Sequence, residues 1–167
     1  YKNMLLGLDL DADLASVLHC LNDNLADAVK CDELRVLHGR DHIYEELLGL
    51  RFKISPFSFF QTNTLGAEKL YSMAREFVGD YKDKVLYDLY SGTGTIGQAL
   101  SQKARKVYGI EIVEDAIKDA KRNAKINNMD NVEFYVGKAE EVVPKMYKEG
   151  KRANVVVVDP PRKGCDE

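Results

Sequence analysis

The sequence predicts an α/β protein with a doubly wound parallel sheet, and two observations lead to that prediction. From Lys84 onward, short apolar runs alternate with segments of helical periodicity, which is the pattern of βαβ units. The first apolar run, at 85–89, leads into three glycines with G-x-G-x-x-G spacing at Gly92, Gly94 and Gly97. A strand that turns through glycines into a helix lets a ligand approach free backbone N–H groups. This glycine loop is therefore the first candidate binding element.

The elements of this region are expected in strict alternation. Strands are expected at 85–89, 106–110, 132–136 and 153–158, and helices at 94–103, 113–127 and 140–148. The last strand is nearly all valine, and continuous β-branched runs are typical of strands that are buried on both faces. A strand order of 3-2-1-4 would nevertheless leave residues 155–158 at an edge of the sheet. An apolar edge strand is a template for association, so self-association through 155–158 is expected.

The chain before this region is expected to divide near residue 55. Residues 1–55 should form a small β-rich accessory segment, and residues 56–167 should belong to the larger domain. Strands are expected at 33–37, 42–47 and 50–54. Residues 11–29 leave two alternatives, either a helix with Asp11 or Asp13 as its N-cap or a short strand over 17–21.

An aromatic stretch, Ile54-Ser-Pro-Phe-Ser-Phe-Phe-Gln-Thr-Asn63, joins the two parts. Thr62 or Thr64 is expected to cap a helix that ends near residue 78. The residues expected on its buried face are Ala67, Leu70, Ala74 and Phe77. The stretch is either an aromatic plug followed by a helix cap or a loop that holds the Gln61 amide toward a ligand.

Composition is typical of an ordinary soluble domain. The chain has 167 residues, is 45% hydrophobic and 31% charged, and contains no apolar run long enough to span a bilayer. Three cysteines without C-x-x-C spacing argue against a disulfide framework or a structural zinc site, so a cytoplasmic setting and no metal are expected. The net charge of −3 lacks the overall basic character of a nucleic-acid binder. Residues 1–50 carry four Lys/Arg against ten Asp/Glu, which is most simply a solvated acidic face.

Polar side chains follow the predicted strands, at the sheet edge where open α/β sheets bind ligands. Glu111 ends the second strand about twenty residues beyond the glycine loop, which is the position of an acid that accepts hydrogen bonds from ribose hydroxyls. Asp88 and Tyr90 precede the glycines, and a carboxylate there suits a cationic ligand and repels a pyrophosphate. These positions favour S-adenosylmethionine over NAD, with an NAD-dependent oxidoreductase as the fallback.

The fourth strand ends in Asp159-Pro-Pro-Arg162. Consecutive prolines fix φ and remove hydrogen-bond donors, so the segment is either only a stiff turn or a rigid loop that presents Asp159 and Arg162. Its place beside the glycine loop favours the second interpretation.

Five motifs together resemble the RNA uracil-5-methyltransferases. They are Phe59-Phe-Gln-Thr-Asn63, Asp88-Leu-Tyr-Ser-Gly-Thr-Gly-Thr-Ile-Gly97, Gly109-Ile-Glu111, Asp159-Pro-Pro-Arg-Lys-Gly164 and the preceding Gly39-Arg-Asp-His-Ile-Tyr-Glu-Glu46. Enzymes of this family use S-adenosylmethionine to make 5-methyluridine in ribosomal or transfer RNA. The resemblance covers roughly residues 35–167. It implies a Rossmann-like methyltransferase fold, incomplete at the C-terminus, and methylation of an RNA, with 23S ribosomal RNA as the first candidate.

The resemblance also implies a set of cofactor contacts. The implied residues are Gln61, Tyr90, Gly92, Thr95, Glu111 and Asp159. Glu111 would bind the ribose hydroxyls, and Tyr90 and Thr95 would line the methionine end. Gln61 and Asp159 would lie where the cofactor meets the target base.

The sequence departs from the family in its catalytic residues. In the family, a cysteine in a Ser-Cys-Asn-Pro motif adds to C6 of uracil and a glutamate removes the C5 proton, and both lie downstream of the Asp-Pro-Pro-Arg motif. This chain stops at Glu167, so no catalytic residue is expected in it, and Cys165 is interpreted as a structural or incidental thiol. An N-terminal RNA-binding barrel and cluster-binding cysteines, both found in relatives, are also absent. The chain is therefore expected to be a fragment of a longer enzyme and inactive alone.

Two other functions stay open from the sequence. An S-adenosylmethionine-dependent enzyme that methylates nitrogen in a base or protein would need no cysteine, but it does not explain the Phe-Phe-Gln-x-Asn motif. A cofactor-binding module without turnover is the non-enzymatic alternative.

Overall fold

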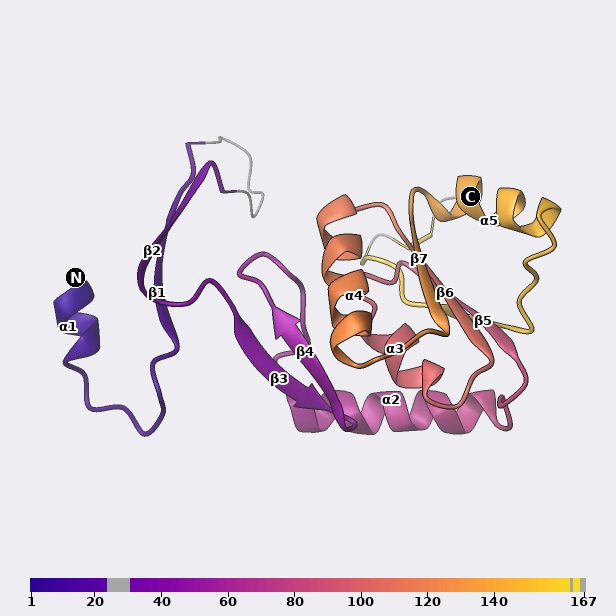
Figure 1. Cartoon of the computed structure of the whole chain (residues 1–167), viewed down its shortest axis with the longest axis horizontal. Coiled ribbons are helices and arrows are strands. Elements are labelled where there is room, and N and C mark those ends of the chain that lie inside the picture. Colours follow the sequence, from indigo (N-terminus) through magenta and orange to yellow (C-terminus); the bar gives the residue numbers. More distant parts are fainter. Residues whose placement is uncertain (24–30, 163, 166–167) are drawn as a thin grey trace.

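A computed structural model describes residues 1–23, 31–162 and 164–165 of the chain (Figure 1). Its elements, in chain order, are α1 (Lys2–Leu6), β1 (Ser16–Leu21), β2 (Glu33–Gly39), β3 (Ile43–Leu47), β4 (Leu50–Ile54), α2 (Thr64–Val78), β5 (Val85–Leu89), α3 (Thr95–Ser101), β6 (Lys106–Glu111), α4 (Glu114–Ile126), β7 (Val132–Val136), α5 (Ala139–Lys148) and β8 (Val155–Val158). None of the helices in these ranges is long and apolar enough to cross a membrane.

The α/β prediction is confirmed by a four-stranded parallel sheet. Its order is β7-β6-β5-β8, which is the predicted order 3-2-1-4. On one face, Leu86 and Val107 pack with Leu100 of α3. On the other face, Tyr87 and Ile110 pack with Met146 of α5. Because all four strands are parallel, their carboxyl ends lie at one edge of the sheet.

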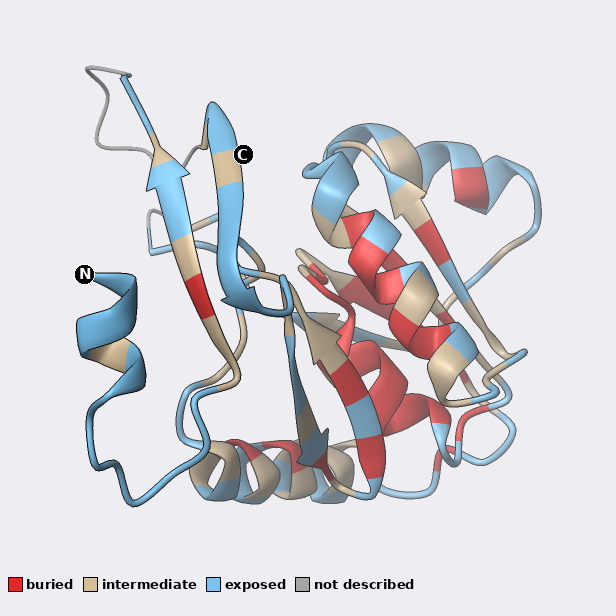
Figure 2. Ribbon diagram, turned by 60° about the vertical axis from the view of Figure 1, so that its left-hand side comes forward, coloured by how far each residue is buried: buried red, intermediate tan, exposed pale blue. Residues whose placement is uncertain are grey.

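The N-terminal part contains two antiparallel strand pairs, β1–β2 and β3–β4. Within the ambiguous stretch 11–29, residues 16–21 form a strand, so a helix that starts at Asp11 or Asp13 is wrong there; residues 24–30 lie outside the described ranges. The short helix α1 was not predicted. Figure 2 shows that α1, β1 and β2 are mostly exposed, whereas the buried residues gather in and around the sheet. The domain boundary near residue 55 stays a prediction.

Helix α2 has a different cap and a different buried face from those predicted. Its N-cap is Asn63, whose side chain accepts a hydrogen bond from Gly66 N–H at 2.9 Å, and neither Thr62 nor Thr64 takes that role. Ala67 is buried as predicted, but Tyr71 is the other buried residue of the helix. Leu70 is exposed and Phe77 is 86% exposed, because the helix turns its Ala67–Tyr71 side toward the core that includes Leu47, Phe52 and Ala99.

A ladder of side-chain amides joins α4 to β4. Asn127 binds the backbone of Arg51, accepting from its N–H at 2.8 Å and donating to its carbonyl at 3.0 Å. Asn123 binds Lys53 in the same way, at 2.9 and 3.2 Å. The spacing works because four helical residues rise about 6 Å and two strand residues about 6.6 Å. The amides therefore fasten the β3–β4 hairpin to the larger domain.

Strand β8 is an edge strand that is partly buried on one face and exposed on the other, contrary to the expectation of burial on both. Val155 and Val157 pack inward, but Val156 is 50% exposed and Val158 is 47% exposed. Among the described residues, β8 pairs with β5 alone. Its free edge and its valine face are therefore both available to another chain.

We expect this edge to cause self-association at high concentration. Replacing Val156 and Val158 by lysine puts charges on the exposed face and should shift the chain toward monomer, because charged edges oppose strand pairing. Sedimentation velocity of both forms over a concentration series measures the shift. A monodisperse monomer of the unmodified chain at high concentration would contradict the prediction.

Candidate functional site

A cavity of about 350 Å³ opens at the carboxyl edge of the sheet. Tyr90, Glu111 and Asp159, which lie at the carboxyl ends of three neighbouring strands, all line it. The remaining wall comes from Ile110 and Ile112, from residues 137–140 at the start of α5, and from Pro161 and Gly164 after β8. A cavity of this volume falls in the range of small-molecule sites. Three of the six predicted cofactor contacts thus meet around one space.

The glycine loop bends through left-handed backbone next to this cavity. Tyr90 has φ +61°, Gly92 φ +53° and Gly94 φ +74°. A Cβ at Gly94 would lie 2.6 Å from the Phe134 ring, so both conformation and space require glycine there. Unlike the two glycines, Tyr90 has a Cβ, so its left-handed backbone conformation is strained. Strain of this kind clusters at functional sites.

The Glu111 carboxylate is fixed by two backbone donors. Its Oε2 accepts from Gly92 N–H at 3.0 Å, and its Oε1 accepts from Val113 N–H at 2.9 Å. Each carboxylate oxygen can accept a second hydrogen bond, so the group is held in place and can still bind two hydroxyls. The Gly92 N–H is already used by this carboxylate. The loop is therefore poorly suited to a pyrophosphate, which would need free donors and would be repelled.

Asp88 lies fully buried below the glycine loop. Its Oδ2 accepts from Gly97 N–H at 2.8 Å, and its Oδ1 has no hydrogen-bond partner. Burial raises the pKa of this carboxyl to about 7, against the lowering effect of the Gly97 N–H, and the Asp159 and Glu111 charges raise it further. Three carboxyl groups this close to one another create a negative potential that favours a cationic ligand.

The other predicted contacts lie apart from the cavity. Thr95 is buried at the start of α3, where its Oγ1 lies 3.2 Å from Thr93 Oγ1. Gly92 lines a neighbouring space of about 750 Å³ that shares Glu111 with the cavity. Gln61 lines a third space of about 430 Å³, on the side of the β3–β4 hairpin. The structure thus places Gly92 beside the Tyr90–Glu111–Asp159 cavity but does not place Thr95 or Gln61 in its wall.

Tyr71 is a residue of this region that the sequence did not reveal. Burial, followed by the charges of Asp159 and Asp88, raises the pKa of its hydroxyl to about 12. The phenol therefore lies buried within the field of the site carboxylates. In the sequence, Tyr71 is marked only by its helical spacing, four residues after Ala67, and this spacing indicates a core position and no role in a site.

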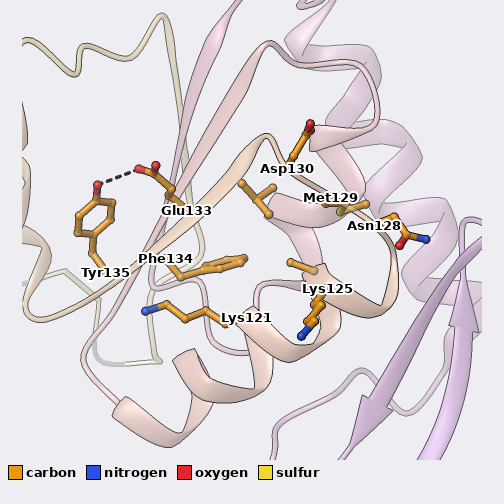
Figure 3. Close-up of a pocket in the computed structure, with 10 residues that line it drawn as sticks. Lys121, Lys125, Asn128, Met129, Asp130, Glu133, Phe134 and Tyr135 are labelled. Atoms are coloured by element: carbon orange, nitrogen blue, oxygen red, sulfur yellow. Dashed lines mark hydrogen bonds between the residues drawn. The ribbon is translucent and has the colours of Figure 1, made fainter.

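A separate groove of about 660 Å³ lies between α4 and β7 (Figure 3). Lys121, Lys125 and Phe134 line it, together with Glu133, whose carboxylate accepts from Tyr135 Oη at 2.9 Å. None of the predicted site residues lines this groove. Within the described ranges, no group of three or more His, Cys, Asp or Glu side chains is arranged to hold a metal ion. The strand-end cavity remains the candidate site.

Comparison with known proteins agrees with this geometry. A family model described as a methyltransferase domain matches residues 80–161, which span the sheet and its glycine loop. A protein of Clostridium tetani, named an uncharacterized RNA methyltransferase, is 48% identical over 98% of this chain and 35% of its own length. Another of that name, from Caldanaerobacter subterraneus, is 52% identical over 95% of this chain and 34% of its own length. Residues 80–161 are therefore similar to a methyltransferase domain, and the chain as a whole is similar to proteins named RNA methyltransferases.

A solved structure shows the same similarity. The tRNA (uracil-54, C5)-methyltransferase of Pyrococcus abyssi, in complex with S-adenosyl-L-homocysteine, is 34% identical and superposes with a TM-score of 0.73. The match covers 93% of this chain and 37% of that protein. The Rossmann-like methyltransferase fold is therefore confirmed. The chain spans about a third of the length of the curated relatives it matches.

Proposed function

We propose that the chain is the cofactor-binding part of an S-adenosylmethionine-dependent RNA methyltransferase that acts on C5 of uridine in the cytoplasm. The observation that carries the proposal is the cavity shared by Tyr90, Glu111 and Asp159, with buried Asp88 beside it. Its carboxyl groups favour a ligand that bears an ammonium and a sulfonium, and the sulfonium methyl is the group such a cofactor supplies. The relatives named RNA methyltransferases support RNA as the substrate.

Each site residue has a role in this proposal. Glu111, held by Gly92 and Val113, would accept hydrogen bonds from two ribose hydroxyls. Tyr90 would line the methionine end of the cofactor, where Asp88 contributes negative charge. Asp159 and Gln61 would lie toward the target base, and Thr95 would act from beneath the loop through its contact with Thr93.

Uridine C5 as the target is supported by the Pyrococcus abyssi enzyme and by the aromatic stretch. Phe59 is 74% exposed beside Gly92 and Glu111, and an exposed ring can stack on an unpaired base. The comparison protein is a transfer-RNA methyltransferase, whereas ribosomal RNA was the first candidate from the sequence. We therefore propose a uridine in RNA as the target, and methylation assays on both RNA classes decide between them.

Calorimetric titration of the chain with S-adenosylmethionine and, separately, with NAD tests the cofactor assignment. We expect binding of S-adenosylmethionine and none of NAD, because the carboxyl groups repel a pyrophosphate. S-adenosylhomocysteine, which lacks the positive sulfonium charge, serves as the matched ligand and should bind through the same ribose contacts. Binding of NAD without S-adenosylmethionine would contradict the proposal.

A further inference from the structure

The loop 55–61 separates two of the spaces at the site. Phe57 and Phe59 line the space that contains Gly92 and Glu111, whereas Phe60 and Gln61 line the space on the hairpin side. Ser55 and Ser58 line both. The loop is therefore a partition, and its position decides where the Gln61 amide lies relative to the cofactor cavity.

One carboxylate of α4 holds this partition. Asp119 Oδ2 accepts a hydrogen bond from Ser55 Oγ at 2.8 Å and another from Ser58 Oγ. Its other oxygen, Oδ1, lies 2.7 Å from Arg122 Nη2 in an ion pair. Asp119 is buried, and its two serine partners are 64 and 61 residues away in the sequence. A buried carboxylate that accepts two hydroxyls and pairs with an arginine has a fixed orientation.

Asp119 continues the amide ladder of α4. Asn127 binds Arg51 and Asn123 binds Lys53, so each step of four residues along the helix matches two residues of β4. The next step reaches Asp119 and Ser55, just beyond the end of the strand at Ile54. At this step the Asp119 carboxylate binds serine hydroxyls, whereas the asparagine amides of the two earlier steps bind backbone groups. The loop has a second attachment at Phe59, whose carbonyl accepts from Thr93 Oγ1 at 3.3 Å.

We infer that Asp119 is a positioning residue for the cofactor site. It fixes the loop 55–61 and thereby sets the place of Gln61, whose amide has no hydrogen-bond partner among the described residues and is free to bind a ligand. The inference rests on the proposed function for its effect on cofactor affinity. Its effect on the loop is independent of any ligand.

A tryptophan at position 59 gives a ligand-free readout, since the chain contains no other tryptophan and Phe59 is exposed. In the Phe59→Trp background, fluorescence anisotropy decay reports the motion of the loop. Asp119→Ala should add fast local motion, and Asn127→Ala, the matched control at the far end of the ladder, should not. Asp119→Asn keeps an oxygen for the serine hydroxyls, so its loop motion should lie between that of the unmodified loop and that of Asp119→Ala. Unchanged loop motion in Asp119→Ala would overturn the inference.

A double-mutant cycle with Gln61→Ala tests the link to the cofactor. We expect Asp119→Ala and Gln61→Ala each to weaken S-adenosylmethionine binding about tenfold, and the double variant to weaken it by little more than either, because coupled residues are not additive. Asn127→Ala combined with Gln61→Ala should give the simple product of the single effects. Additive losses for Asp119 and Gln61, or equal losses for Asp119→Ala and Asn127→Ala, would overturn the inference. If the unmodified chain binds no S-adenosylmethionine, the proposed function fails and the anisotropy decay alone decides the role of Asp119.

Discussion

At pH 8 the Asp88→Asn variant is expected to be more stable than the unmodified chain, and near pH 4 the two should be nearly equal. The folded state raises the pKa of Asp88 from its ordinary 3.8 to about 7, chiefly through burial. Between these values the folded protein retains a proton that the unfolded chain releases, so this group lowers stability as pH rises. Above about pH 7 the loss is complete and amounts to about 4 kcal/mol, at 1.36 kcal/mol for each pKa unit.

Asparagine suits this test because it keeps a side-chain oxygen for Gly97 N–H and cannot ionise. Urea unfolding at pH 4.5 and pH 8 measures the difference in unfolding free energy between the variants. Asp115→Asn is the matched control, since the Asp115 side chain is exposed. A stability difference that is the same at both pH values would contradict the assignment to Asp88. At pH 8, where the Asp88 carboxyl is ionised, the same variant should bind S-adenosylmethionine more weakly, because it removes a negative charge beside the cavity.

Glu111→Ala is expected to weaken S-adenosylmethionine binding by about 100-fold or more, since hydrogen bonds to a charged group contribute about 1.5–3 kcal/mol each and two are lost. Glu111→Gln keeps the shape of the side chain and should retain part of the affinity. Calorimetric titration measures the losses, and Glu141→Ala, which removes an exposed glutamate of α5, is the control. An affinity within a factor of two or three of the unmodified chain would exclude Glu111 as the ribose ligand.

The parallel sheet was predictable because its signals are local. The β-branched runs, the glycine spacing and the acids at strand ends located β5, β6 and the Tyr90–Glu111–Asp159 cavity within a residue or two. The face of α2 was not predictable in the same way. Leu70 and Phe77 have the helical spacing of a buried stripe, but the core selected Ala67 and Tyr71 instead. Tertiary packing, which the periodicity of one helix cannot reveal, decided between the two stripes.

The parts of the site that depend on distant residues were also missed. Asp119 meets Ser55 and Ser58 across more than sixty residues, and no spacing within α4 marks it as different from any solvent-facing acid. Gln61 was predicted from a resemblance that carries residue identity but no account of how the loop is held. Its place on the hairpin side follows from the contacts of the loop, which only the fold provides.

The match between α4 and β4 also limits how this protein can change in length. Asn127 with Arg51, Asn123 with Lys53 and Asp119 with Ser55 stay in step because both elements advance by nearly equal distances. Inserting or deleting one residue within either element would rotate the helical side chains away from their partners or reverse the strand face beyond that point. Loops elsewhere tolerate such changes, whereas these two elements can gain or lose residues only together.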